Sequence, residues 1–437
     1  MTDVVQQLLN GDVSFFVGDT AAHATGWLRH PERYFGEWLD DIDARLPRRY
    51  NRTLLLGMGG SSSPARLYAD WRPENNLTVV DTSHPDTVAA LDFDYATVIA
   101  SSKSGGTVET QTLLAHALAN GLSPEDLVII TDPGTALAEL GASLGALVVL
   151  GDPDTGGRFS SLSPFGLIPA LYAGWSVAEL RDELATCYLT EELLVRVAND
   201  AEAMATTIVD GAAFFSLGAD PIASGGALWL EQLVAETTGK EGRGFIPVFD
   251  GAAALYSPGE MQYYHLLAAL LAHHLGVDPF NQPNVETAKK EVFALLEGEV
   301  TWEAAPFAMI DLVNDLQSAQ YITIQAYAPF SSGAQLASLR REIEAQYGPT
   351  TANLGPRYLH STGQLHKGGP AGVVGVQVIQ RPATAPQRIA GRGYSFHDLH
   401  MAQATGDYRA MQQSGKRVYQ VIVDAIDDAG ALLGLTL

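Results

Sequence analysis

The stretch LLLGMGGSSS, residues 54–63, runs from apolar residues into a loop of glycines and serines. A second stretch of the same layout, VIASSKSGGT, occupies residues 98–107. Glycines let a loop curl so that backbone N–H groups point inward, and a helix behind the loop adds the positive end of its dipole. Two such loops on neighbouring strands would close around one phosphate group, so a phosphorylated small molecule is the first substrate class to consider. The hydroxyl donors of these loops are Ser61, Ser62, Ser102, Ser104 and Thr107.

Around these loops, short apolar runs alternate with helical patterns. Such alternation predicts a parallel sheet with helices on both faces, which binds ligands beyond the carboxyl ends of its strands. Both glycine and serine loops fall at those ends. The expected strands are 52–57, 77–81, 96–101, 126–131 and 146–150, and the expected helices are 64–70, 85–91, 107–119 and 135–143.

A breaker-rich segment, residues 151–164, separates this unit from a second α/β unit. In the second unit we expect strands at 213–217, 244–249, 321–327, 354–359 and 372–379, with helices at 222–237, 260–275 and 331–347. A further strand is possible at 418–423. The predicted organisation is an N-terminal helical segment 1–50, a first α/β domain 51–190, a second α/β domain 191–395 and a C-terminal helical tail 396–437.

The composition of the 437 residues is that of an ordinary globular protein, with 46% hydrophobic and 17% charged residues. A net charge of −24 disfavours nucleic acid and anionic membranes as partners, so a phosphate has to be met by a local concentration of positive charge. Cys187 is the only cysteine, which precludes an intrachain disulfide and fits a reducing compartment. With no basic and apolar leader and no run of ~20 apolar residues, the expected location is the cytoplasm.

The first loop partly imitates the dinucleotide-binding fingerprint, and Asp81 ends the next strand where a ribose-binding acid could lie. Ser62, however, replaces the third glycine of that fingerprint. Three successive serines have little use in a close-packed dinucleotide turn, but they suit a terminal phosphate. We therefore expect Asp81 to be a cap or turn residue, and glycines of purely structural value remain the alternative for the loop.

Two further segments carry groups suited to catalysis. GGRFS, residues 156–160, places Arg158 on a loop just past the first sheet, where its permanent charge could stabilise an oxyanion, although a surface ion pair is the more common use of arginine. Residues 231–240, EQLVAETTGK, end a helix at a glycine. Glu236 follows an apolar stretch there, and a carboxylate withdrawn from water is a better base for a C–H proton. The alternative role for Glu236 is to cap the helix.

Two polar segments follow in the second half. PFNQPNVETAKK, residues 279–290, is an Asn/Pro turn leading into a helix that carries Lys289 and Lys290. YLHSTGQLHKGG, residues 358–369, is rich in hydrogen-bonding groups and holds His360 and His366. Because no acid or thiol with ligand spacing accompanies these histidines, we predict no metal site.

Five motifs together resemble the phosphoglucose isomerase family, which is built from two sugar-isomerase (SIS) type domains, each a parallel sheet flanked by helices. The matching pieces are GxGGS at 57–61, SKxxxTxET at 102–110, GGRFS at 156–160, QxxxExxGK at 232–240 and FNQPxVExxK at 280–289. The LHSTGQLHKGG segment, which follows the lysine motif, looks most like the isomerase half of fused transaldolase–isomerase proteins.

The resemblance implies cofactor-free interconversion of glucose 6-phosphate and fructose 6-phosphate by a homodimer. Glu236 would move a proton between C1 and C2 through a cis-enediolate, while Arg158 would stabilise this intermediate and Gln232 would orient the sugar. Lys289 and His360 would open the sugar ring. The residues implied at the phosphate are Ser61, Ser102, Ser104 and Thr107, with Gly60 and Lys103 beside them.

The sequence departs from the family pattern at several points. Thr237 follows the glutamate where serine is common, and the second loop has Ser104-Gly105-Gly106 in place of bulkier residues. In many relatives the histidine motif precedes the lysine motif and the histidine comes from the partner subunit, which keeps His366 open as the alternative to His360. The other functions that stay open are a dual glucose/mannose phosphate isomerase, a non-catalytic sugar-phosphate sensor and a dinucleotide-dependent oxidoreductase.

Overall fold

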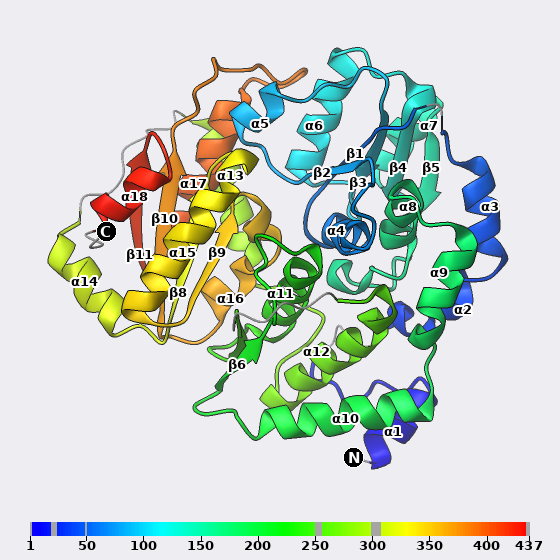
Figure 1. Ribbon diagram of the computed structural model, residues 1–437, viewed down its shortest axis with the longest axis horizontal. Helices are drawn as coiled ribbons and strands as arrows, with labels where there is room; N and C mark the ends of the chain where they lie inside the picture. The colour runs from blue at the N-terminus through cyan, green and yellow to red at the C-terminus, as the bar shows by residue number, and fades with distance from the viewer. Residues whose placement is uncertain (1, 19–23, 49, 250–255, 299–306, 434–437) are drawn as a thin grey trace.

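The structure, a computed structural model, describes residues 2–18, 24–48, 50–249, 256–298 and 307–433. It contains two larger parallel sheets, with helix α11 (Gly225–Thr238) between them (Figure 1). The side chains of residues 285–289, in a later helix, lie outside the described part.

The first sheet has the strand order β2-β1-β3-β4-β5, and every neighbouring pair is parallel. Strands β1, β3 and β4 are buried along their whole length, as expected for apolar runs covered on both faces. All five expected strands are confirmed to within a residue. They are β1 (Thr53–Gly57), β2 (Leu77–Val80), β3 (Thr97–Ser101), β4 (Leu127–Thr131) and β5 (Leu147–Leu150).

The strand order reverses between β1 and β3, because the chain leaves β1 toward β2 and returns to β3 on the other side. At such a switch point the loops after the two strands diverge to opposite faces and leave a crevice. The two glycine and serine loops flank this crevice. The helices of this unit are α4 (Ser63–Asp70), α5 (Pro85–Ala89), α6 (Val108–Ala119), α7 (Ala136–Leu144) and α8 (Pro164–Tyr172).

The second large sheet has the order β11-β10-β8-β9, again fully parallel. A separate parallel pair, β6 (Ala212–Ser216) and β7 (Gly244–Val248), lies beside β9. The strands of the large sheet are β8 (Tyr321–Tyr327), β9 (Thr350–Leu354), β10 (Val373–Gln380) and β11 (Arg417–Val423). The helices around it are α14 (Met309–Gln317), α15 (Gly333–Tyr347), α16 (Gly363–Gly368), α17 (Phe396–Gln413) and α18 (Asp427–Leu432).

One expected strand is wrong. Residues 354–359 do not form a strand; β9 lies earlier, and a 3-10 helix spans Arg357–His360. Pro356 has no N–H to donate to a ladder, so the strand ends before it. The sequence of β9, TTANL, is too polar to predict a buried strand, although all five of its residues are buried.

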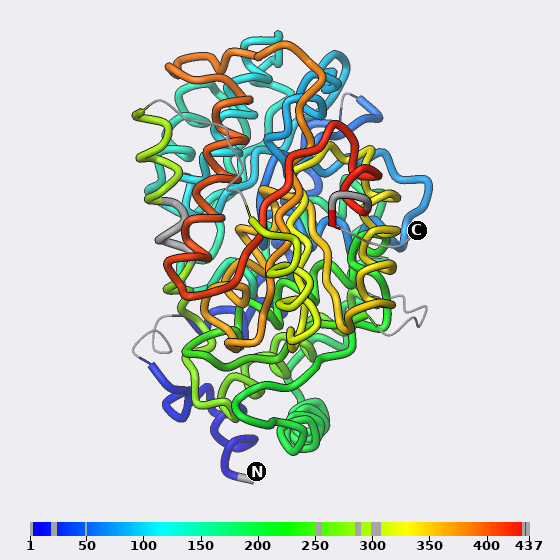
Figure 2. Tube along the Cα trace, turned by 90° about the vertical axis from the view of Figure 1, so that its left-hand side faces the viewer, coloured from blue at the N-terminus to red at the C-terminus, as the bar shows by residue number. Residues whose placement is uncertain are grey.

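The C-terminal segment, expected as a helical tail, contributes to the second sheet. Strand β11 pairs with β10 over seven residues, from Val374–Arg417 to Gln380–Val423 (Figures 1 and 2). Helix α17 packs along α13 (Val285–Glu297), and apolar residues of both helices join the core on one face of the first sheet. Residues 396–433 are therefore integral to the structure, and the exact domain boundaries stay predictions.

The largest apolar core joins the N-terminal segment to the other face of the first sheet and to α11. It draws on α1 (Thr2–Leu9), α2 (His30–Tyr34), α3 (Glu37–Arg45), α9 (Val177–Leu184), α10 (Glu191–Ala205) and α12 (Met261–Leu275). Within the described residues, every helix is too short or too polar to cross a membrane.

Candidate active site

Three segments meet at the loop after β1. Gly59 has a φ of +53°, and a Cβ added there would lie 2.5 Å from the carbonyl oxygen of His360 and 2.9 Å from Nε2 of Gln232. A Cβ added at Gly60 would overlap the carbonyl of Gly157 in the GGRFS segment. These glycines therefore let the backbone of the His360 and GGRFS segments approach the loop closely. This close approach accounts for the two successive glycines without a bound dinucleotide.

Helix α11 supplies Gln232 and Glu236, one turn apart on the same face. Nε2 of Gln232 donates to Oε2 of Glu236 at 3.2 Å and to the carbonyl oxygen of His360 at 3.0 Å. The other end of this amide accepts a hydrogen bond of 2.7 Å from Ser63. Glu236 is buried, with 6% of its surface exposed, and Gln232 fixes the direction of its carboxylate. This confirms the burial expected from the sequence and disfavours a mere capping role at the helix end.

The guanidinium of Arg158 is buried behind this carboxylate. Nη1 donates to the carbonyl oxygens of Glu236 at 2.6 Å and Pro279 at 3.1 Å, and Nη2 donates to Asn281 O at 3.1 Å and Gln282 Oε1 at 2.9 Å. Its Nε lies 3.6 Å from Oε2 of Glu236. Burial lowers the pKa of Arg158, but arginine starts from so high a value that it stays charged at neutral pH. The result is a fixed positive charge next to the carboxylate, not a surface ion pair.

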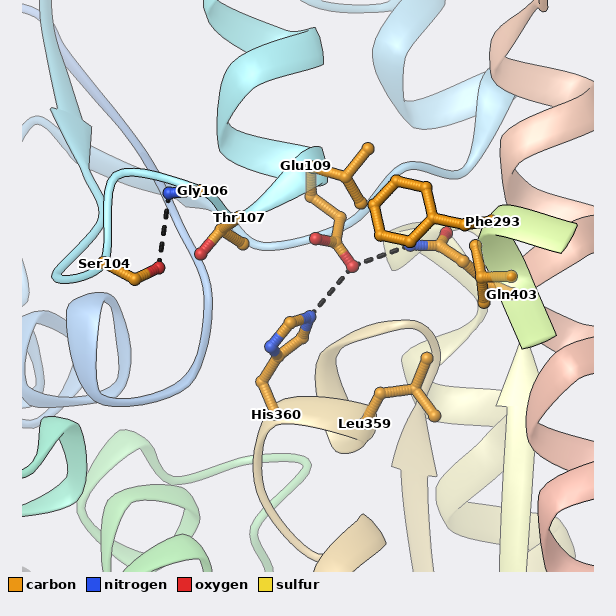
Figure 3. Close-up of a pocket in the computed structure, with 10 residues that line it drawn as sticks. Ser104, Gly106, Thr107, Glu109, Phe293, Leu359, His360 and Gln403 are labelled. Carbon is orange, nitrogen blue, oxygen red and sulfur yellow. Dashed lines mark hydrogen bonds and ion pairs between the residues drawn. The ribbon is translucent and has the colours of Figure 1, made fainter. Parts of the chain in front are cut away.

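A cavity of about 150 Å³ opens beside this cluster, between the loop after β3 and the His360 segment (Figure 3). Nε2 of His360 lies 2.9 Å from Oε1 of the buried Glu109, and Nε2 of Gln403 donates to the same oxygen at 2.6 Å. The apolar side of the cavity is formed by Val108, Val292, Phe293 and Leu359. His360 thus belongs to both clusters, through its carbonyl at Gln232 and its imidazole at Glu109.

Two of the four hydroxyls expected at a phosphate line this cavity, and a third is hydrogen-bonded to one of them. Ser104 and Thr107 line the cavity together with Gly106, and Ser102 donates to Oγ1 of Thr107 at 2.9 Å. Ser61 is buried in the first loop. At the start of α6, Thr107 makes no side-chain capping bond, so its hydroxyl serves Ser102 instead of the helix end.

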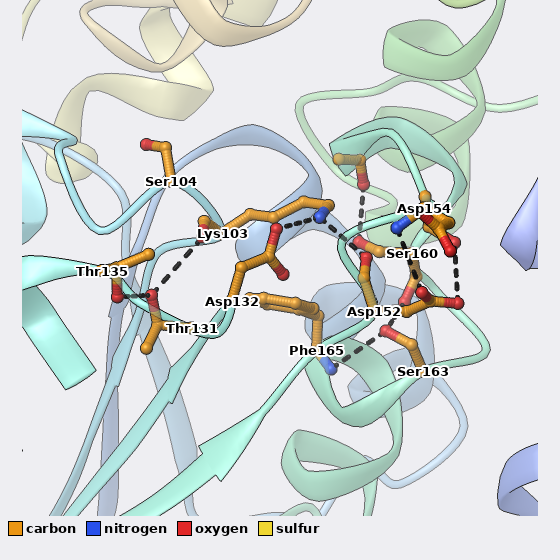
Figure 4. Close-up of polar contacts among 12 residues, drawn as sticks. Lys103, Ser104, Thr131, Asp132, Thr135, Asp152, Asp154, Ser160, Ser163 and Phe165 are labelled. Atoms are coloured by element: carbon orange, nitrogen blue, oxygen red, sulfur yellow. Dashed lines mark hydrogen bonds and ion pairs between the residues drawn. The ribbon is translucent and has the colours of Figure 1, made fainter. Parts of the chain in front are cut away.

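Lys103 lies apart from the cavity-lining residues. Its ammonium forms an ion pair with Asp132 and donates to the carbonyl oxygen of Asp152 at 2.9 Å (Figure 4). Asp132 therefore offsets the positive charge of Lys103, which the family resemblance implied beside the phosphate. In this arrangement Lys103 ties the second loop to the segment that leads to Arg158.

Lys289 lies within α13, and the position of its side chain is outside the described residues. The start of α13 is nevertheless well held. Oε1 of Gln364 accepts from the backbone N of Asn284 at 3.0 Å, and Nε2 donates to Oδ1 of Asn284 at 2.8 Å and to Gly239 O at 2.9 Å. Gln364, in the LHSTGQLHKGG segment, therefore links the end of α11 to the lysine motif.

The two candidate histidines occupy different environments. His366 is fully buried between Thr323 and Gln325 of β8, at 3.0 and 3.2 Å, and burial lowers its pKa well below the ordinary value. His360 lines the cavity, with 20% of its side chain exposed. Only His360 is placed to reach a ligand there, and it reaches Glu109 of the same chain.

Sequence reasoning did not single out Glu109 or Gln403. Glu109 falls inside the quoted motif 102–110, and an acid between two threonines at the start of a helix was an available signal. Nothing in the sequence around Gln403 indicates a functional role, because this residue lies on α17, far from Glu109 in the sequence. Among the described residues, no three His, Cys, Asp or Glu side chains are grouped so that they could hold a metal ion.

Comparison with known proteins relates the chain to sugar-phosphate isomerases. No family model matches it. It is 28% identical over 280 residues to a glucose-6-phosphate isomerase of Heliobacterium modesticaldum, covering 53% of this chain and 59% of the relative. It is 32% identical over 199 residues to that of Thermus thermophilus, covering 40% and 46% of the two chains. These matches show that part of the chain is similar to glucose-6-phosphate isomerases.

The matched region spans only part of these relatives, between 28 and 37% of the length of the first four. A solved tagatose-6-phosphate ketose/aldose isomerase from Escherichia coli aligns over 90% of this chain and 91% of its own, with 14% identity and a TM-score of 0.35. At that score the fold assignment rests on the strand order and pairing of this chain alone.

Proposed function

We propose that this protein interconverts glucose 6-phosphate and fructose 6-phosphate by proton transfer between C1 and C2. The observation that carries the proposal is the buried Glu236 carboxylate, oriented by Gln232 and facing Nε of Arg158 at 3.6 Å. An aldose–ketose shift needs one base that reaches two adjacent carbons and positive charge near two oxygens. Sequence similarity to glucose-6-phosphate isomerases supports the same reaction.

The reaction begins with opening of the cyclic sugar at the Glu109–His360 pair. Nδ1 of His360 takes the proton of the C1 hydroxyl, the C1–O5 bond breaks to leave an aldehyde, and the imidazolium gives the proton to O5. Glu109, at 2.9 Å from Nε2, stabilises the imidazolium in between. Lys289, which the family resemblance implies at this step, would assist at the ring oxygen.

Isomerisation of the open chain then falls to Glu236. Its carboxylate removes the proton from C2, and the electron pair moves onto the C1 oxygen to form a cis-enediolate. The Arg158 guanidinium offsets this charge, and because four acceptors hold it in place, little reorganisation is needed as the charge develops. After a proton moves between the two enediol oxygens, Glu236 returns its own proton to C1 and the ketose forms.

The phosphate binds to the hydroxyl and backbone donors of the two glycine loops. Ser61, Ser102, Ser104 and Thr107 supply hydroxyls, and Gly60 and Gly106 bring backbone N–H groups close. Lys103 contributes indirectly, because its ion pair with Asp132 anchors the second loop. A homodimer and a cytoplasmic location remain predictions from the sequence.

The decisive experiment is a coupled isomerase assay on the purified chain and on Glu236→Gln, with fructose 6-phosphate as substrate. We expect the substitution to lower kcat by about 100-fold or more, as for loss of a general base, with sugar-phosphate binding largely kept. Glu231→Gln is the matched control, because Glu231 is another buried glutamate on the same helix, and its carboxyl group accepts hydrogen bonds from Asn353.

Two results would count against the proposal: turnover by Glu236→Gln equal to that of the control, or no turnover by the wild-type chain. A parallel assay with mannose 6-phosphate separates the single-substrate enzyme from a dual glucose/mannose phosphate isomerase, since the two sugars differ only at C2.

A further inference from the structure

Gln403 connects the histidine pair of the cavity to a second buried residue. It lies on α17 and is 1% exposed. Its Nε2 donates to Oε1 of Glu109 at 2.6 Å, and its Oε1 accepts a hydrogen bond of 2.6 Å from the hydroxyl of Ser83, which is fully buried. The chain of contacts Ser83–Gln403–Glu109–His360 therefore joins the loop after β2, the C-terminal helix α17, the start of α6 and the 3-10 helix after β9.

The chemistry of these groups fixes which atom donates in each of these hydrogen bonds. A carboxylate oxygen can only accept, so the end of the amide that faces Glu109 has to be the NH₂ group. Ser83 then donates to the carbonyl end. Oε1 of Glu109 accepts from Gln403, and the same oxygen lies 2.9 Å from Nε2 of His360. That imidazole nitrogen must therefore carry a hydrogen, and in the neutral ring Nδ1 is left as the acceptor.

We propose that Gln403, held by Ser83, is a positioning residue that fixes the Glu109 carboxylate and thereby the tautomer of His360. The inference rests on the proposed function, because it assigns to Nδ1 the proton exchange of ring opening. Figure 3 shows the His360 ring with one nitrogen toward Glu109 and the other directed away from it. Without the amide, Oε1 of Glu109 loses one of its hydrogen-bond donors, and the Glu109–His360 bond that selects this tautomer is held less firmly.

The chain offers a closely matched control in Gln377. This buried glutamine on β10 donates to the carbonyl oxygen of Ala404, on the same helix α17, and accepts from Gln420 at 2.6 Å. Gln377→Met removes a buried amide with two partners, as Gln403→Met does, but leaves Glu109 untouched. Any general loosening of α17 should affect both variants.

The functional test isolates ring opening. In a Glu236→Gln background, which blocks C–H transfer, exchange between the α and β anomers of glucose 6-phosphate is followed by NMR. We expect Gln403→Met to slow the protein-catalysed exchange by about tenfold or more, as when the group that orients a catalytic imidazole is lost, and Gln377→Met to leave it within about twofold. Equal rates for the two variants would overturn the proposal.

A second readout does not depend on activity. In uniformly ¹⁵N-labelled protein, two-bond ¹H–¹⁵N correlations report which nitrogen of His360 is protonated. We expect the Nε2–H form in the wild type and in Gln377→Met, and a mixture of tautomers in Gln403→Met. The same Nε2–H spectrum in Gln403→Met would contradict the inference. If Gln403→Met fails to fold, Ser83→Ala, which frees only the far end of the amide, gives the same comparison.

These results separate the two proposals. A wild-type chain without isomerase turnover removes the proposed function, whatever the His360 spectrum shows. An active wild type whose Gln403→Met variant opens the ring normally removes only the role of Gln403.

Discussion

Replacing Gly59 by alanine tests whether the loop after β1 holds the site together. The added Cβ lies 2.5 Å from the carbonyl oxygen of His360 and 2.9 Å from Nε2 of Gln232, whereas real Cβ atoms essentially never approach below 3.0 Å. The His360 carbonyl therefore has to retreat by at least about 0.5 Å, and with it the bond that Gln232 donates to this oxygen. The substitution acts on the two residues that orient Glu236 and carry the imidazole.

Two costs add in this variant. Gly59 has a φ of +53°, and a side chain in the left-handed region costs about 1–2 kcal/mol. Forcing a methyl group into a packed site costs a further ~1–3 kcal/mol. Gly134→Ala separates the two, because Gly134 has a φ of +75° and nothing within 4 Å of its Cβ position. Chemical denaturation should show that Gly59→Ala lowers the free energy of unfolding by the larger amount.

The coupled isomerase assay should separate the two variants further. A displacement of about 1 Å in a catalytic constellation can cost about 100-fold in rate, so for half that displacement we expect kcat/KM of Gly59→Ala to fall by roughly tenfold or more. Gly134→Ala should keep the wild-type value. The reasoning is refuted if the two variants share the same kcat/KM, because the close approach at Gly59 would then have no bearing on the site.

Two further substitutions test ionisable groups near the site. Burial raises the pKa of Glu231 from 4.5 to about 8, so between these pH values the folded state keeps a proton that the unfolded chain releases. The free energy of unfolding of the wild type should therefore fall relative to that of Glu231→Gln as the pH rises from 4.5 to about 8. Denaturation at several pH values measures this difference, and parallel curves for the two proteins would contradict it. Lys103→Met leaves Asp132 without its ion pair and should lower the free energy of unfolding by about 1–3 kcal/mol. KM should rise by less than about tenfold, because only the anchoring of the phosphate-binding loop is weakened. A tenfold rise in KM at unchanged stability would instead place the ammonium at the phosphate.

Much of the fold could be predicted from the sequence, because its strands follow local patterns. Every strand of the first sheet is an apolar run bounded by breakers, and such runs need no long-range information. β9 shows the limit of this reasoning. Thr350 and Asn353 look like loop residues, but they are buried with hydrogen-bond partners. Thr350 donates to the carbonyl oxygen of Gly348 at 2.8 Å, and Asn353 donates to both carboxyl oxygens of Glu231 at 3.0 Å.

The candidate site was partly predictable for the same reason. Glu236, Arg158 and His360 lie in short motifs with chemically distinctive residues, and the structure brings the segments that carry them together. Gln403 and Ser83 were not predictable, since a single glutamine on a helix has no signal until the fold places it 2.6 Å from a buried carboxylate. For Asp81, the position at the end of a predicted strand led to a wrong expectation. Asp81 was expected as a cap or turn residue, but it bonds to Arg66 at 2.8 and 3.1 Å.

The same Asp81 shows how the two sheets are coupled at the site. It lies at the end of β2 in the first sheet, and Arg357, at the start of the 3-10 helix that carries His360, lies 3.8 Å from its carboxylate. The other end of that helix meets Gly59 and Gln232 through the His360 carbonyl. Because these partners belong to the first sheet and to α11, His360 reaches Glu109 only when both sheets are docked. In the proposed mechanism, ring opening and C–H transfer therefore both depend on this one interface. A substitution that loosens it should impair both steps before the chain unfolds.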